Sequence, residues 1–103
     1  MTARKLRLGA FIMATGHHIA AWRHPGAQPD AGVNIDHYIE LAQTAERGLF
    51  DQVFVADSPG IWHQGDRESF SRQGRLSHFE PVTLWAALSA VTKHIGFVAT
   101  AST

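Results

Sequence analysis

Three short apolar segments alternate with two longer segments of helical periodicity along the chain. The apolar segments are LRLGAFIM at 6–13, FDQVFVA at 50–56 and IGFVATAST at 95–103. Between them, apolar residues recur every three or four positions over 35–47 and from 81 to about 94. Strands and helices that alternate in this way favour a parallel sheet. The chain is therefore predicted to be an α/β protein with parallel strands in the order β-α-β-α-β.

The ends of both predicted helices carry recognisable signals. Asn34 is the predicted N-cap of the first helix, and Gly48 stands where the C-terminus of a helix favours a left-handed residue. Pro81 suits the first turn of the second helix. The predicted apolar faces are Ile35, Tyr38, Ile39, Ala42 and Ala45 in the first helix, and Val82, Trp85, Leu88 and Val91, widened by Leu84 and Ala87, in the second.

Two long loops follow the first two predicted strands. Residues 17–32 and 57–78 lack a hydrophobic period and are rich in glycine, proline, histidine and charged residues. Loops of this length are uncommon in a compact domain unless they serve a function. We therefore expect both loops to contribute to a functional site.

Composition and charge exclude several classes of partner. The nine basic and nine acidic residues cancel, which argues against nucleic acid or an anionic membrane surface as a partner. The chain has no cysteine, so it forms no disulfide framework. No apolar run approaches the roughly 18 residues of a membrane span, and the run LGAFIMA is short for a signal peptide. These features predict a soluble, cytoplasmic protein.

Polar residues follow or end each predicted strand. His17 and His18 come after the first strand, Asp57 and Ser58 come after the second, and the third ends in the run Thr100–Thr103. The C-terminal ends of parallel strands meet at one edge of a sheet. We therefore expect these three clusters to lie together, with Asp57 at the centre of a site.

Each cluster also has a structural interpretation. Asp57 and Ser58 are ordinary turn formers, and strand threonines often bond neighbouring carbonyls. A metal site would combine the two adjacent histidines with His24, His37 or Asp57. Adjacent histidines on an extended segment point in opposite directions, however, and no HExxH or HxH spacing accompanies them. A bound metal is therefore not predicted.

The first junction between strand and helix argues against two common nucleotide sites. It reads MATGHHIAAW, which lacks both the GxGxxG fingerprint of dinucleotide-binding domains and the GxxxxGK phosphate loop. A (β/α)8 barrel instead distributes its site over several loops that follow the strands. That arrangement agrees with the three polar clusters.

Three segments resemble a known family. GHHIAAWRHP, HYIELAQTAERGLFDQVFVADSPGIW and EPVTLWAALSAVTKHIGFVATAST are similar to the N-terminal part of the bacterial-luciferase-like flavin monooxygenases. Within that family they resemble the branch of nitrilotriacetate/EDTA monooxygenase and dibenzothiophene-sulfone monooxygenase. The resemblance extends from about residue 6 to 103 and implies the first part of a TIM (β/α)8 barrel.

The resemblance also implies a cofactor and a reaction. Family members use reduced FMN, supplied by a separate flavin reductase, and O2 to oxygenate a small organic substrate through a flavin hydroperoxide. By resemblance, Asp57 and Thr103 are expected to contact the flavin, whereas His17 or His18 is expected near the substrate or the isoalloxazine ring.

The length of the chain limits what it is expected to do alone. A closed barrel needs eight strands in about 250 residues, whereas three strands are predicted here. We expect residues 1–103 to be the N-terminal portion of a single, incomplete barrel domain that is inactive by itself. The alternative is a non-catalytic remnant or interaction module that pairs through exposed strand edges. In either case a homo-oligomer is expected.

Overall fold

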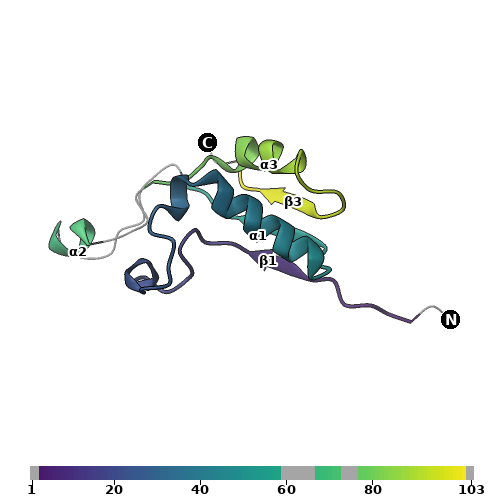
Figure 1. The fold of residues 1–103 in the computed structure, drawn as a ribbon, viewed down its shortest axis with the longest axis horizontal. Coiled ribbons are helices and arrows are strands. Elements are labelled where there is room, and N and C mark those ends of the chain that lie inside the picture. The colour runs from purple at the N-terminus through teal and green to yellow at the C-terminus, as the bar shows by residue number, and fades with distance from the viewer. Residues whose placement is uncertain (1–2, 59–66, 73–76, 102–103) are drawn as a thin grey trace.

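The computed structural model describes residues 3–58, 67–72 and 77–101 (Figure 1). Its elements in chain order are strand β1 (Gly9–Phe11), 3-10 helices η1 (Ala21–Arg23) and η2 (Ala31–Val33), helix α1 (Ile35–Arg47), strand β2 (Gln52–Val55), helices α2 (Arg67–Ser71) and α3 (Pro81–Ser89), and strand β3 (Gly96–Ala99). The predicted order β-α-β-α-β is confirmed. The strands are shorter than predicted, and both predicted loops contain short helices.

The three strands form one parallel sheet in the order β1-β2-β3. Two rows of paired residues cross it, Gly9–Gln52–Gly96 and Phe11–Phe54–Val98. Because all strands run in the same direction, their C-terminal ends lie at one edge of the sheet. The predicted meeting of the strand ends is therefore present in the structure.

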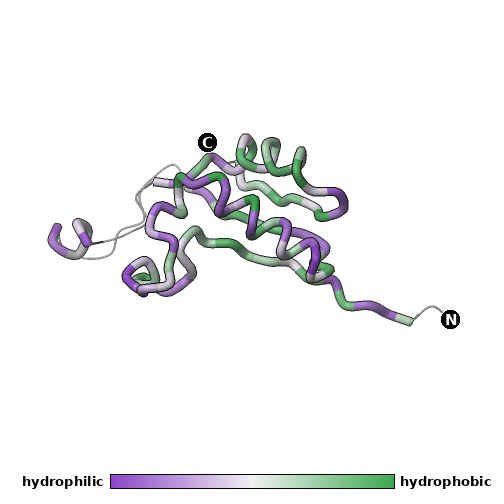
Figure 2. Tube along the Cα trace, in the orientation of Figure 1, coloured by the Kyte–Doolittle hydropathy of each residue, from purple (hydrophilic) through white to green (hydrophobic). Residues whose placement is uncertain are grey.

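Helices α1 and α3 cover one face of the sheet, and their buried residues share a core with β2. Figure 2 shows that α3 and β3 are hydrophobic over most of their length, whereas α1 alternates between polar and apolar residues. The other face of the sheet is open, since Phe11 is 47% and Val98 40% exposed. The buried core comprises Tyr38, Ala42, Val53, Val55, Leu84, Trp85, Leu88 and Ile95.

Helix α1 follows its sequence signals closely. The Asn34 side chain accepts a hydrogen bond from the His37 backbone N–H at 3.2 Å, which confirms the predicted N-cap. Tyr38 and Ala42 are buried, and burial raises the pKa of the Tyr38 hydroxyl. The remaining predicted face residues, Ile39 and Ala45, pack against the core, whereas Ile35 is exposed.

Helix α3 departs from its prediction in two ways. Its buried face is Pro81, Leu84, Trp85 and Leu88, whereas Val82, Ala87 and Val91, which were predicted on the apolar face, are exposed. The helix also ends at Ser89, five residues before the predicted end at His94.

The N-cap of α3 is Glu80, whose carboxylate accepts the N–H groups of Val82 and Thr83 at 2.9 and 2.8 Å. The prediction of Trp85 as a core residue is confirmed, and its indole N–H donates to Val98 O.

A carboxylate on α1 binds the backbone between α3 and β3. The N–H groups of Lys93, His94 and Ile95 all donate to Glu46 Oε2, at 2.8, 2.7 and 3.0 Å. Three successive N–H groups that converge on one oxygen form a nest, which is a concavity that binds anions. These bonds, led by that from His94, lower the pKa of Glu46 to about 2. Glu46 therefore fixes the start of β3 against the end of α1.

Asp51 fixes the start of β2 in a similar way. Its carboxylate accepts the backbone N–H of Leu8 at 2.8 Å and pairs with Arg7 at 3.1 Å. The bond from Leu8, followed by that from Arg7, lowers the pKa of Asp51. Leu8 O in turn accepts the N–H of Asp51 at 2.8 Å. These contacts set the register of β1 against β2 at the N-terminal edge of the sheet.

The left-handed residue at the end of α1 is Leu49 and not the predicted Gly48. Gly48 has φ −77°, whereas Leu49 has φ +62°. The Leu49 N–H donates to Glu46 O and the Phe50 N–H to Ala45 O, at 3.1 and 3.0 Å. This is the Schellman motif, in which the left-handed residue is the second one after the last helical residue. A leucine there is strained, because its Cβ crowds the following carbonyl.

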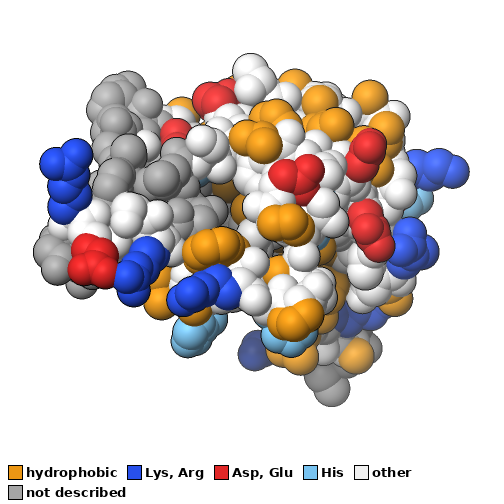
Figure 3. All heavy atoms as spheres, turned by 60° about the vertical axis from the view of Figure 1, so that its left-hand side comes forward, with side chains coloured by type: hydrophobic (Ala, Val, Ile, Leu, Met, Phe, Trp, Pro, Cys, Tyr) orange, Lys and Arg blue, Asp and Glu red, His pale blue; other side chains and the backbone are white. Residues whose placement is uncertain are grey.

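Charges of both signs are interspersed with hydrophobic side chains on the face shown in Figure 3. Among the described residues, no helix is long and apolar enough to cross a membrane.

The strained Leu49 generates a first prediction. Leu49→Gly is expected to raise the free energy of unfolding by about 0.5–1 kcal/mol, because relief of a strain of about 1–2 kcal/mol exceeds the added entropy of the unfolded chain. Leu49→Ala is the matched control, since it removes the same side chain, which is 83% exposed, but keeps the Cβ. Urea unfolding measures both variants. A glycine variant no more stable than the alanine variant would contradict the strain.

The bonds to Glu46 predict how stability depends on pH. The pKa of this carboxyl falls from 4.5 to about 2 on folding, so its stabilising contribution is complete above about pH 4.5 and is lost as the pH falls toward 2. Glu46→Gln is expected to remove this part of the acid sensitivity, as measured by urea midpoints between pH 5 and 2. The control is Glu40→Gln, at an exposed residue of α1. If both variants lose stability in parallel with the wild type, the nest contributes nothing.

Candidate functional site

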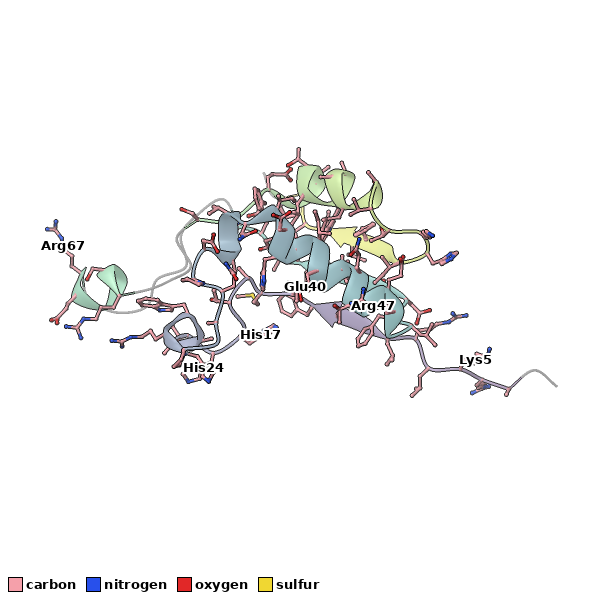
Figure 4. All side chains as sticks on the ribbon, in the orientation of Figure 1. Lys5, His17, His24, Glu40, Arg47 and Arg67 are labelled. Atoms are coloured by element: carbon pink, nitrogen blue, oxygen red, sulfur yellow. The ribbon has the colours of Figure 1, made fainter. Side chains whose placement is uncertain are left out.

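The predicted site residues lie around the C-terminal edge of the sheet. His17 is on the loop after β1 (Figure 4), Asp57 follows the end of β2, and Thr100 follows β3 directly. Parallel pairing brings these chain segments to the same edge. Ser102 and the predicted flavin contact Thr103 lie outside the described residues.

His17 is held against the end of β1. Its Nε2–H donates to Phe11 O at 2.9 Å, and its ring meets the Phe11 ring edge-on at 4.8 Å between centroids. The Phe11 ring also packs against that of Phe54 on β2, at 5.0 Å. Three rings therefore run in sequence from the middle strand to the first loop.

A hollow of about 340 Å³ lies beside these rings on the open face of the sheet. Its walls are mostly apolar, and the Gln52 side chain supplies a polar group. The Gln52 side chain lies over Gly9, where an added Cβ would stand 3.1 Å from the Gln52 amide nitrogen. Gly9 therefore leaves room for this amide in the hollow. The lining residues are Gly9, Ala10, Phe11, Gln52, Phe54 and Val98.

His18 has a different contact from its neighbour. Its Nδ1 accepts the backbone N–H of Ala20 at 3.1 Å, which closes a local turn. The structure therefore brings His17, and not His18, against the aromatic rings of the sheet. Sequence alone treated the two histidines as equivalent candidates for a substrate pocket.

Asp57 and Thr100 also differ in their surroundings. The Asp57 carboxylate lies 3.9 Å from His78 Nδ1, and its side chain is 18% exposed. The Thr100 hydroxyl donates to Val55 O at 3.3 Å, so it serves the sheet. The structural interpretation of the strand-end threonines therefore holds for Thr100, whereas Asp57 faces a second ionisable side chain.

The histidines proposed as alternative metal ligands make other contacts. His24 Nδ1 accepts the N–H of Gly26 at 2.9 Å, and His37 Nε2–H donates to Ala14 O at 3.0 Å. Within residues 3–58, 67–72 and 77–101, no three side chains of His, Cys, Asp or Glu cluster closely enough to hold a metal ion.

The comparison with known families decides the class of protein to which this site belongs. A family model described as luciferase-like monooxygenase matches residues 11–103. The chain belongs to the luciferase-like monooxygenase family. The predicted resemblance is thereby confirmed.

Two curated relatives of the chain are named as monooxygenases. N-acetyl-S-(2-succino)cysteine monooxygenase of Bacillus subtilis (strain 168) is 50% identical over 105 residues, which cover 100% of this chain and 22% of the relative. Nitrilotriacetate monooxygenase component A of Aminobacter aminovorans is 39% identical, with 97% and 23% covered. The chain thus spans less than a quarter of the length of these luciferase-like relatives.

Solved structures place the three strands within a larger barrel. A long-chain alkane monooxygenase matches with a TM-score of 0.81 and 33% identity, covering 97% of this chain and 24% of that one. An EDTA monooxygenase from Chelativorans sp. BNC1 shares the fold, with a TM-score of 0.79, 24% identity and coverage of 95% and 22%. The parallel sheet described here is the first part of a TIM barrel, as predicted.

Sequence reasoning missed two residues beside the site. His78 follows a long loop, and nothing in the sequence indicates that it faces Asp57. Gly32 was treated as an ordinary loop glycine, yet a Cβ built on it would lie 2.1 Å from Ser77 O. Both contacts join segments far apart in the chain, so no local pattern reveals them. Together they bring the segment before α3 against the two loops of this luciferase-like chain.

Proposed function

We propose that this chain forms part of the reduced-FMN site of a monooxygenase that oxygenates a small organic substrate with O2. The observation that carries the proposal is the position of Asp57 at the end of β2, on the same edge as His17 and Thr100, in a luciferase-like chain. In TIM barrels, the site lies at this C-terminal edge.

The residues at this edge suit a flavin. An isoalloxazine ring is apolar on its faces and carries donors and acceptors along its pyrimidine edge. The rings of Phe11 and Phe54 offer apolar surface beside the hollow, and Asp57 offers a carboxylate acceptor at the neighbouring strand end. We infer that Asp57 and Thr103 orient the ring, and that His17 lies toward its substrate side.

Bound reduced FMN would supply the electrons with which O2 is activated. The contribution of the chain itself is orientation and the exclusion of water. The Phe11 carbonyl holds the His17 imidazole in one orientation. Mostly apolar side chains line the hollow on the open face. None of the described side chains is required as a nucleophile in this scheme.

The proposal extends to two partners. A separate flavin reductase would deliver reduced FMN, and the chain would act as a homo-oligomer in the cytoplasm. The relatives are named for chemically unlike substrates, among them nitrilotriacetate and long-chain alkanes. The class of substrate is therefore left at a small organic molecule.

The role of Asp57 is tested in a chimera. Residues 1–103 replace the matching segment of the Bacillus subtilis relative, and binding of reduced FMN is measured anaerobically by fluorescence. Asp57→Asn is expected to raise Kd about tenfold or more, because a hydrogen bond to a charged group contributes about 1.5–3 kcal/mol. Glu40→Gln, which removes a carboxylate from the surface of α1 (Figure 4), should leave Kd unchanged.

The isolated chain completes this test. It is expected to bind FMN weakly and to show no turnover, since the phosphate and most of the substrate would be held by other parts of a barrel. Sub-micromolar binding by the isolated chain would contradict that expectation. A chimera that folds and binds FMN equally well with and without Asp57 would remove the aspartate from the site.

One observation favours a second candidate function. Each of β1 and β3 has a single neighbour in the described sheet, beside an open face with exposed Phe11 and Val98. Unpaired strand edges are templates for pairing with another chain. We propose as the alternative a non-catalytic interaction module that pairs through these edges.

Light scattering coupled to size-exclusion chromatography tests the alternative. Pairing through strand edges should give a stoichiometric oligomer that Val98→Lys converts to monomer, because a charged lysine on an edge strand disfavours sheet extension. The control is Val82→Lys, at an exposed valine on α3 rather than on a strand. A wild-type chain that elutes as a clean monomer would exclude the module.

A further inference from the structure

The Asp57 carboxylate has an ionisable neighbour from beyond the second long loop. His78 Nδ1 lies 3.9 Å from Asp57 Oδ1, with side-chain exposures of 44% and 18%. This distance exceeds a hydrogen bond and lies within the 4.0 Å range of an electrostatic pair. The same Nδ1 makes a hydrogen bond with Phe79 O at 3.3 Å. Within the described part of the chain, no second carboxylate lies within 4.0 Å of His78. The adjacent Glu80 is instead engaged by the N–H groups of Val82 and Thr83.

The backbone that carries His78 is held on both sides. The Phe79 N–H donates to Gly32 O at 3.1 Å, and Ser77 O approaches Gly32 so closely that no side chain fits there. The Phe79 ring packs edge-on against buried Tyr38, at 5.8 Å between centroids. The His78 side chain is therefore presented to Asp57 by an ordered segment.

We propose that His78 is a positioning residue for Asp57. The His78 imidazole lies beside the partly buried Asp57 carboxylate, and when it is protonated it attracts the carboxylate and restricts its rotation. His78 thereby orients the carboxylate toward a ligand that His78 itself need not touch. The inference rests on the proposed function, in which that ligand is reduced FMN.

A double-mutant cycle without flavin tests the contact itself. Asp57→Asn, His78→Gln and the double variant are compared by urea unfolding of the 103-residue chain. We expect a coupling of about two- to threefold in the unfolding equilibrium constant, as for a partly exposed ion pair, and its reduction at high salt. Additive effects of the two substitutions would overturn the proposal.

The same cycle in the chimera measures positioning. His78→Gln is expected to raise Kd for reduced FMN about two- to fivefold when Asp57 is present, and to have no effect when residue 57 is asparagine. A purely structural role would weaken binding equally in both backgrounds. The inference is therefore overturned if His78→Gln raises Kd equally in both backgrounds. It is also overturned if His78→Gln leaves Kd unchanged when Asp57 is present.

A second variant tests the segment rather than the imidazole. Gly32→Ala forces the backbone at Ser77 to move, so it should weaken FMN binding in the same direction as His78→Gln. Gly48→Ala is the matched control, because its Cβ meets neighbours only at 3.4 Å or more. Equal affinities of the two alanine variants would contradict the role of the segment.

The outcomes separate this inference from the proposed function. If Asp57→Asn leaves FMN affinity unchanged, the proposed flavin site fails, whatever the unfolding cycle shows. If Asp57→Asn weakens binding while both cycles are additive, the flavin site stands and the positioning role of His78 is wrong.

Discussion

The parallel pairing of β2 with both β1 and β3 constrains the rest of the structure. Parallel neighbours require a crossover connection, and the chain meets this requirement with α1 and with the segment that ends in α3. Both helices bury their apolar faces against Val53 and Val55 on the same side of the sheet. The crossovers also return the chain to the same end of the sheet, so that all three strands run in one direction. The groups that follow the strands consequently share an edge.

The two edges of the sheet use carboxylates differently. At the N-terminal edge, Asp51 and Glu46 accept backbone N–H groups and fix where β2 and β3 begin. At the C-terminal edge, Asp57 faces the side chain of His78. Backbone-bound carboxylates are structural, because they satisfy groups that the fold leaves unpaired. The proposed role of Asp57, which lies beside an imidazole, is to orient a ligand. This division agrees with the roles of the two ends of a TIM barrel.

The open face of the sheet corresponds to the interior of the barrel in the luciferase-like family. Barrel strands direct alternate side chains inward, where they pack in layers. The rows Gly9–Gln52–Gly96 and Phe11–Phe54–Val98 lie on the open face of the sheet, which corresponds to the interior of a barrel. The first row carries the polar Gln52 side chain between two glycines, and the second row is apolar. The chain spans 22% to 24% of the luciferase-like proteins compared with it, so its open face corresponds to only part of a barrel interior.

The sequence by itself determined the features that depend on neighbouring residues. The order of elements, the bounds of α1, its Asn34 cap and the place of Pro81 follow from periodicity and local hydrogen bonding. Short sequence motifs also indicated the resemblance to the luciferase-like family.

Only the tertiary structure decided the contacts between distant segments. Glu46 holds the segment between α3 and β3 through bonds to residues more than 45 positions away. Likewise, Ser77 meets Gly32, and His78 meets Asp57. The left-handed residue proved to be Leu49, because the Schellman bonds follow from where the helix actually stops. Such contacts depend on how segments pack in space, so local patterns of residue type do not predict them.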